Sequence, residues 1–226
     1  IKKEVNQKII KIGMPSAMQM FFEVALFTGA IWLCGMIGTT SQAANQIALS
    51  LASLTFMFAM GLSVTAMIRI GNQKGLNDYV TLRKVAISIF LLTIIIEVVF
   101  ALLFVLLHTS LPYIFVDIND AKNLTENLEV IAISANLLLV AAVFQISDGL
   151  QVVVLGALRG LQDAKIPMYI TFVAYWVIGF PISIYLGLET ELKAVGVWIG
   201  LLAGLTAAAL FLYIRFNYLT KKLIQN

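Results

Sequence analysis

Apolar residues fill six long stretches of the chain, and short polar segments separate them. Each stretch is long enough to cross a bilayer, because a transmembrane helix needs about 20 mostly apolar residues. We therefore predict an all-α integral membrane protein without a soluble domain. The predicted spans form one six-helix lobe over residues 1–226 and are residues 12–37, 43–70, 83–107, 128–157, 166–188 and 194–217. The predicted breaks, rich in turn-forming and charged residues, are residues 38–42, 71–78, 112–129, 160–165 and 189–193.

The composition supports a membrane protein and argues against several other classes. Hydrophobic residues make up 61% of the chain and charged residues 12%, whereas soluble domains carry about 25% charged residues. The net charge of +3 is spread over loops and span ends rather than gathered on a basic face, so we expect no nucleic-acid partner. A single cysteine, Cys34, excludes an internal disulfide framework. No catalytic or cofactor-binding motif is found, so we predict neither an enzyme nor a cofactor.

The distribution of basic residues predicts the orientation in the membrane. An even number of spans puts both ends of the segment on one side, and loops rich in Lys and Arg face the cytoplasm. The ends and loops on the predicted cytoplasmic side carry Lys2, Lys3, Lys8, Lys11, Arg69, Lys74, Arg83, Lys84, Arg159, Lys165, Arg215, Lys221 and Lys222. The opposite side carries only Lys122 and Lys193, together with acids that include Asp117, Asp120 and Glu189. Both ends of this segment are therefore predicted to be cytoplasmic.

Small residues recur every fourth position in three predicted spans. Helices in lipid associate by close backbone approach at such stripes, so we expect tight helix packing there. The stripes are Gly196, Gly200, Gly204 and Ala208 in the last span, Ala44, Ala48 and Ala52 in the second, and Gly156 with Gly160 in the fourth. Pro181 lies well inside the fifth span and predicts a kink, which is a candidate hinge.

Three acids lie within predicted spans: Glu23, Glu97 and Asp148. An ionised side chain near the bilayer centre is costly, so such residues usually face a protein interior, an ion path or a water-filled cavity. At 1.5 Å per residue, Glu23 and Asp148 both lie roughly 15 Å from the predicted cytoplasmic edge. They share a depth near the midplane. Glu97 has mainly apolar neighbours, and its role stays open between a functional acid and one satisfied by packing.

The helical neighbours of Glu23 and Asp148 give both acids partly polar stripes. We predict that these neighbours line a substrate cavity, and they are Gln19, Phe27, Phe144, Gln145 and Gln151, with Gln46 from the second span. A buried carboxyl beside a second one can hold a proton, Na⁺ or an organic cation, so Glu23 and Asp148 are candidate cation ligands. A purely structural hydrogen bond between neutral carboxyls stays open as the alternative.

Several segments carry a specific resemblance to a known transporter family. They are Ile12-Gly-Met-Pro-Ser-Ala-Met-Gln-Met-Phe-Phe-Glu23, Gly38-Thr-Thr with Ala43 through Ile47, Arg69-Ile-Gly71, Asp148-Gly-Leu-Gln-Val with Gly156 through Asp163, and Lys165-Ile-Pro167. In order, spacing and loop content, nearly the whole chain resembles the C-terminal half of a multidrug and toxic compound extrusion (MATE) exporter of the NorM type.

The resemblance implies a twelve-helix bacterial inner-membrane antiporter built from two six-helix lobes, of which the N-terminal lobe is missing here. It implies export of cationic, lipophilic drugs and toxic compounds coupled to Na⁺ or H⁺. The family's glutamate on the first helix and aspartate on the fourth match Glu23 and Asp148. An aromatic residue one turn before that aspartate matches Phe144, which lacks the hydroxyl of members with tyrosine there. The complete protein is expected to be about twice as long as this chain.

Two other functions are compatible with the pattern. A lipid-linked oligosaccharide flippase of the same superfamily would show cationic residues facing the cavity, and no arginine lies mid-span in this sequence. A non-transporting membrane scaffold would use the buried acids for structure alone.

Overall fold

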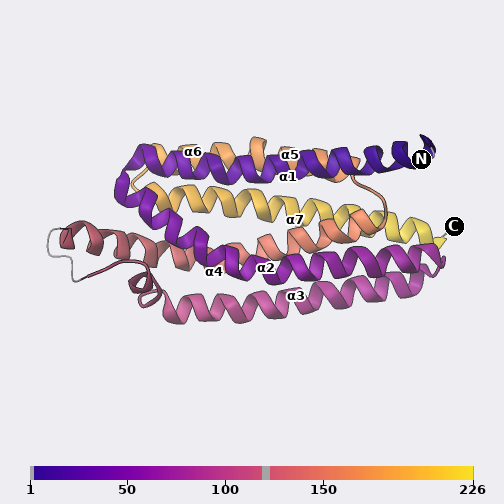
Figure 1. Cartoon of the computed structure of the whole chain (residues 1–226), viewed down its shortest axis with the longest axis horizontal. Coiled ribbons are helices and arrows are strands. Elements are labelled where there is room, and N and C mark those ends of the chain that lie inside the picture. The colour runs from indigo at the N-terminus through magenta and orange to yellow at the C-terminus, as the bar shows by residue number, and fades with distance from the viewer. Residues whose placement is uncertain (1–2, 119–122, 226) are drawn as a thin grey trace.

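Six helical spans run along one common axis in the computed structural model of the chain (Figure 1). The structure describes residues 3–118 and 123–225. The spans are α1 (Lys3–Ile37), α2 (Thr39–Gly75), α3 (Tyr79–Leu107), α4 (Leu124–Gly160), the composite span of α5 (Lys165–Phe172), η2 (Val173–Gly179) and α6 (Phe180–Leu188), and α7 (Lys193–Gln225). A short helix, η1 (Leu111–Ile114), lies between α3 and α4. Within the described residues, six helices are long and apolar enough to cross a membrane, so the chain is a multi-pass membrane protein, as predicted.

The first predicted break is shorter than expected. We predicted a loop over residues 38–42, but α1 and α2 are joined by Gly38 alone. Its backbone angles, φ 158° and ψ 163°, belong to a region that is essentially restricted to glycine. The Gln42 N–H donates to the Gly38 carbonyl at 3.0 Å, so the helical hydrogen bonding resumes at once despite the polar sequence.

The connections between spans divide between the two ends of the bundle. The N-terminus, the C-terminus, the α2–α3 link and the α4–α5 link lie at one end (Figure 1). The α1–α2, α3–α4 and α6–α7 links lie at the other end (Figure 1). Two basic residues of the predicted orientation, Lys2 and Lys122, lie outside the described residues, as does Asp120.

The predicted small-residue stripe of α7 makes the closest helix contacts. A side-chain carbon at Gly196 would collide with the Leu186 carbonyl of α6, and one at Gly200 would collide with Ser183. At Gly204 the same atom would lie 2.9 Å from the Gly179 Cα atom of η2. The Ser183 hydroxyl bridges the two helices by donating to the Val197 carbonyl at 2.9 Å. The tight packing expected for this stripe is confirmed.

The pairing of α2 with α4 is equally close and holds one wall of the cavity described below. Gly156 lies against Ser63, and a side-chain carbon at Gly160 would lie 2.6 Å from the Met67 carbonyl. The Ser63 hydroxyl donates to the Val152 carbonyl at 2.7 Å. These backbone contacts fix the register of α4, and with it the positions of its functional side chains.

The fifth span leaves α-helical geometry just before Pro181. Residues Val173–Gly179 form a π-helix, in which the Phe180 N–H bonds to the Tyr175 carbonyl five residues earlier. Pro181 has no N–H, so one α-helical hydrogen bond is absent here in any case. A change of helix type at this point therefore costs little free energy. Short π segments occur often at functional sites. The role of Pro181 as a hinge stays a prediction.

Candidate functional site

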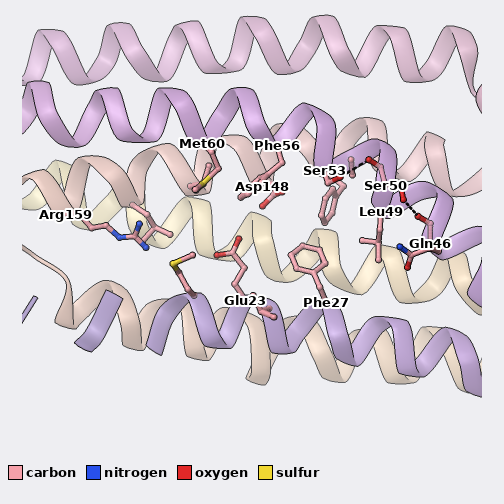
Figure 2. A pocket seen from close by; sticks show the side chains of 16 residues that line it. Glu23, Phe27, Gln46, Leu49, Ser50, Ser53, Phe56, Met60, Asp148 and Arg159 are labelled. Carbon is pink, nitrogen blue, oxygen red and sulfur yellow. Dashed lines mark hydrogen bonds between the residues drawn. The ribbon is translucent and has the colours of Figure 1, made fainter. Parts of the chain in front are cut away.

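A cavity of about 430 Å³ lies between α1 on one side and α2 with α4 on the other (Figure 2). Most of its wall is apolar, and the polar groups are few. The lining residues are Met20, Glu23, Val24 and Phe27 of α1, then Gln46, Leu49, Ser50, Ala52, Ser53, Phe56 and Met60 of α2, and Phe144, Asp148, Val152, Leu155 and Arg159 of α4. Mostly apolar walls with a few placed polar groups are typical of small-molecule sites.

Glu23 and Asp148 meet in this cavity from separate helices. Glu23 points in from α1 and Asp148 from α4 (Figure 2). Both residues line the same cavity, so two acids share one largely apolar site. Asp148 is 6% exposed, and its Oδ1 atom has no hydrogen-bond partner among the described residues. Asp148 thus offers an oxygen that can accept a proton or a cation.

Arg159 is the charged residue of this wall that sequence reasoning missed. It lies at the end of α4 and was assigned to the predicted cytoplasmic edge, but the structure includes its side chain in the cavity wall (Figure 2). Its Nη2 atom donates to the Gln19 Oε1 atom at 3.2 Å. A long arginine stem lets the charge lie well away from its own backbone position, which residue numbering alone does not reveal.

Three of the predicted lining residues do not line the cavity. Gln19, Gln145 and Gln151 are buried beside it, with exposures of 1%, 3% and 0%. Gln145 and Gln151 lie three residues before and after Asp148, which turns each of them about 60° away from it around the helix. Because the cavity meets only a narrow face of α4, both amides face protein instead. Gln19 serves as the partner of Arg159.

The remaining predicted residues, Phe27, Gln46 and Phe144, are on the cavity wall. The Phe27 and Phe144 rings meet at 6.0 Å between centroids, and Phe144 continues onto Trp198 of α7 at 5.1 Å. The Trp198 indole N–H donates to the Asn45 Oδ1 atom at 2.8 Å, which ties α7 to α2 behind the cavity. Contacts outside the cavity, from Trp198 and Asn45, therefore fix the position of the Phe144 ring in the wall.

The cavity becomes more polar toward the end of the bundle that carries the α1–α2 link. Gln46, Ser50 and Ser53 lie on that part of α2 (Figure 2). The Ser50 hydroxyl donates to the Gln46 carbonyl and the Ser53 hydroxyl to the Ser50 carbonyl, each at 2.8 Å. Gln46 and Ser50 also line a second hollow of about 410 Å³ that reaches Asn127 and η1's neighbour Phe115. The two hollows therefore share the part of their walls formed by Gln46 and Ser50.

Two buried groups outside the wall complete the electrostatic surroundings. Tyr175 of η2 is fully buried, and the charges of Glu23 and Asp148 both act on it. Glu97 of α3 is 1% exposed and acts on Asp148 from behind α4. The carboxyl of Glu97 packs where Gly149 has no side chain. The site therefore extends beyond the residues that touch the cavity.

The fold and the site define an all-helical, multi-pass membrane protein with an acidic internal cavity. The chain belongs to the MatE family, whose family model matches residues 15–185. It is 36% identical over 215 residues to a probable multidrug resistance protein NorM of Agrobacterium fabrum, which covers 95% of this chain and 45% of that protein. It is 38% identical over 218 residues to a protein of the same description from Rhodopseudomonas palustris, with 96% and 45% covered.

Solved structures show the same fold. The chain matches the eukaryotic MATE transporter AtDTX14 with a TM-score of 0.83 at 20% identity, over 96% of this chain and 48% of the other. It matches a multidrug resistance MATE family transporter of the MOP superfamily, in an outward-facing conformation, with a TM-score of 0.87 at 16% identity, over 100% and 49%. The chain spans about half the length of the curated relatives it matches, so it is a half-length lobe of the family fold.

Proposed function

We propose that the protein containing this lobe is a cation-coupled antiporter that exports cationic, lipophilic drugs and toxic compounds. The observation that carries the proposal is the pair formed by Glu23 and Asp148 in a cavity whose other walls are largely apolar. An organic cation matches both properties, because its apolar body leaves water while its charge meets a carboxylate. Relatives described as probable multidrug resistance proteins support the same activity.

The proposed exchange follows from competition for the same carboxyls. H⁺ or Na⁺ and the organic cation are both attracted to the site formed by Glu23 and Asp148, so binding of one weakens binding of the other. A coupling ion can shift the lobe between its arrangements only by its difference in affinity for them.

We further propose a bacterial inner membrane as the location, with both ends of this segment in the cytoplasm. The end of the bundle with the N- and C-termini also carries Arg69, Lys74, Arg83, Arg215 and Lys221, which the positive-inside rule assigns to the cytoplasm. The second hollow, beside Gln46, then lies toward the outside. The second lobe, the lipid bilayer and small organic cations are the partners in this proposal.

Neutralising Asp148 tests the function directly. Asp148→Asn keeps the size of the side chain and removes its charge, so we expect export of a fluorescent organic cation to fall to the level of an empty vector. The measurement is efflux from pump-deficient bacteria expressing the full-length parent or the variant, with and without Na⁺. Dependence on Na⁺ names the coupling ion. Normal export by a membrane-inserted Asp148→Asn protein would contradict the proposal.

One observation favours a second candidate, a lipid-linked oligosaccharide flippase. Arg159 reaches the cavity wall, although we expected no arginine there from the sequence. A guanidinium is a suitable group for phosphate recognition. In this cavity, however, it binds Gln19 and shares the wall with two acids, which disfavours an anionic cargo. Translocation of a lipid-linked oligosaccharide by reconstituted full-length protein, with no efflux of organic cations, would select this candidate.

A further inference from the structure

Arg159 is the one basic residue among the described residues that line the cavity. The same wall holds two acids, Glu23 and Asp148. A fixed positive charge in a site proposed for cations reduces the attraction for any cation that enters. The presence of Arg159 in this wall therefore requires an explanation based on its charge, not on the space that its side chain fills.

The geometry associates Arg159 with the part of α1 that carries Glu23. The Arg159 Nη2 atom donates to Gln19, which is four residues before Glu23 on α1. Side chains at this spacing are neighbours on one helix face. The guanidinium and the Glu23 carboxyl line the same cavity without a direct ion pair, since the one ion pair within 4.0 Å among the described residues joins Arg215 and Asp163. Arg159 thus acts on Glu23 from a fixed anchor one helical turn away.

The charges of the wall do not cancel. When both carboxyls are ionised, the guanidinium compensates one of them and leaves one negative charge. Two further titratable groups, Tyr175 of η2 and Glu97 of α3, face this pair electrostatically but lie outside the wall. In a cavity with largely apolar walls, charges act on one another more strongly than in bulk solvent, so this balance governs which ions bind.

We propose that Arg159 is the built-in counter-ion of Glu23, which leaves Asp148 as the one uncompensated acid of the cavity wall and makes the cavity selective for a single monovalent cation at a time. A second cation would enter a site that is already neutral. The coupling ion and the cargo therefore exclude each other by charge, without needing to overlap in space. This inference rests on the proposed cation site and specifies its selectivity.

Variants that neutralise one charge at a time test the inference in a binding assay, without measuring transport. In purified full-length parent protein, binding of tetraphenylphosphonium is measured by equilibrium dialysis. Glu23→Gln should weaken binding about tenfold, the size expected from one coupled charge, because Arg159 then compensates Asp148. Adding Arg159→Gln should restore binding to within about threefold of the parent, because Asp148 again lacks a counter-ion.

A second probe and a matched control separate charge from structure. Arg159→Gln alone should increase binding of the divalent cation methyl viologen relative to tetraphenylphosphonium, because both acids are then uncompensated. Arg159→Lys, which keeps the charge, should leave that ratio as in the parent. Lys165→Gln removes a nearby exposed cation outside the wall and should not restore binding to the Glu23→Gln protein.

The outcomes distinguish this inference from the proposed function. If the parent binds neither cation, the proposed cation site itself fails. If the parent binds but the double variant stays as weak as Glu23→Gln, and Arg159→Gln leaves the ratio of the two probes unchanged, the counter-ion role is overturned alone. Thermal unfolding of each purified variant establishes that the proteins compared are folded.

Discussion

Glu97 occupies a position that is open only because residue 149 of α4 is glycine. Its carboxyl lies against Gly149 of α4, where a side-chain carbon would be 2.8 Å from the Glu97 Cγ atom and 2.9 Å from Oε1. Both Glu97 oxygens are buried without a hydrogen-bond partner among the described residues. The nearby Thr93 hydroxyl is engaged with the Ile89 carbonyl at 2.8 Å. Glu97 is therefore enclosed by packing, and its influence on Asp148 is electrostatic rather than a direct contact.

The contact between Glu97 and Gly149 predicts a non-additive pair of substitutions. Gly149→Ala should destabilise the protein by about 1–3 kcal/mol, because the added methyl group overlaps the Glu97 side chain. Glu97→Ala in the same protein should recover part of that loss by removing the overlapping atoms. Thermal unfolding of the purified full-length parent and its variants measures both effects. Equal stability of Gly149→Ala and the double variant would exclude the contact.

The space available for a side chain at glycine positions differs between α7 and α2. Along α7, Gly196, Gly200 and Gly204 face α6 and η2 at contact distance. On α2, Gly61 has no atom within 4 Å of the position where a side-chain carbon would lie. The α6–α7 contact is thus limited by backbone approach, whereas that part of α2 has free space.

The same substitution should therefore change stability in opposite directions on the two helices. Gly200→Ala should destabilise by about 1–3 kcal/mol because the methyl group collides with Ser183. Gly61→Ala should stabilise by up to about 1 kcal/mol because alanine favours the helix and meets no neighbour. The midpoints of thermal unfolding of the two purified full-length variants test this contrast. Similar destabilisation by both changes would show that the α7 stripe is not the limiting contact.

The apolar pattern was enough to predict the six spans, but it does not locate contacts between them. Glu23 and Asp148 could be found because charge inside an apolar run is conspicuous in any sequence. Arg159 could not, because its guanidinium lies far from its backbone and its partner Gln19 is on another helix. The position of Gln145 and Gln151 beside the cavity, rather than on its wall, has a geometric reason. A helical stripe drawn from spacing is wider than the face that the cavity meets.

At the scale of the whole molecule, the bundle has a basic end and an end with acidic loops. The basic end holds both termini and the α2–α3 link, while the opposite end holds η1 and the α6–α7 link (Figure 1). Large apolar side chains such as Trp32, Met57 and Leu106 remain exposed along the sides, at 74%, 68% and 74%. These sides suit lipid or a second lobe, since neither requires polar groups.

Single cysteines at the two ends should report the proposed orientation. Ser110→Cys lies beside η1, and Gly75→Cys lies in open space at the end of α2. A membrane-impermeant maleimide should label Ser110→Cys in intact cells and Gly75→Cys only after the cells are permeabilised. The native Cys34 is buried and should remain unlabelled in the parent. The reverse labelling pattern would place the basic end outside.

The glycine stripe of α7 also affects how much side-chain conformational entropy is lost when the bundle assembles. A buried leucine or methionine gives up rotamer freedom when it is packed, whereas glycine and alanine have none to lose. Where Gly196, Gly200 and Gly204 meet α6 and η2, assembly therefore brings dispersion contacts with little loss of side-chain entropy. The last two spans can associate closely even though the surrounding lipid provides no hydrophobic drive for helices to meet.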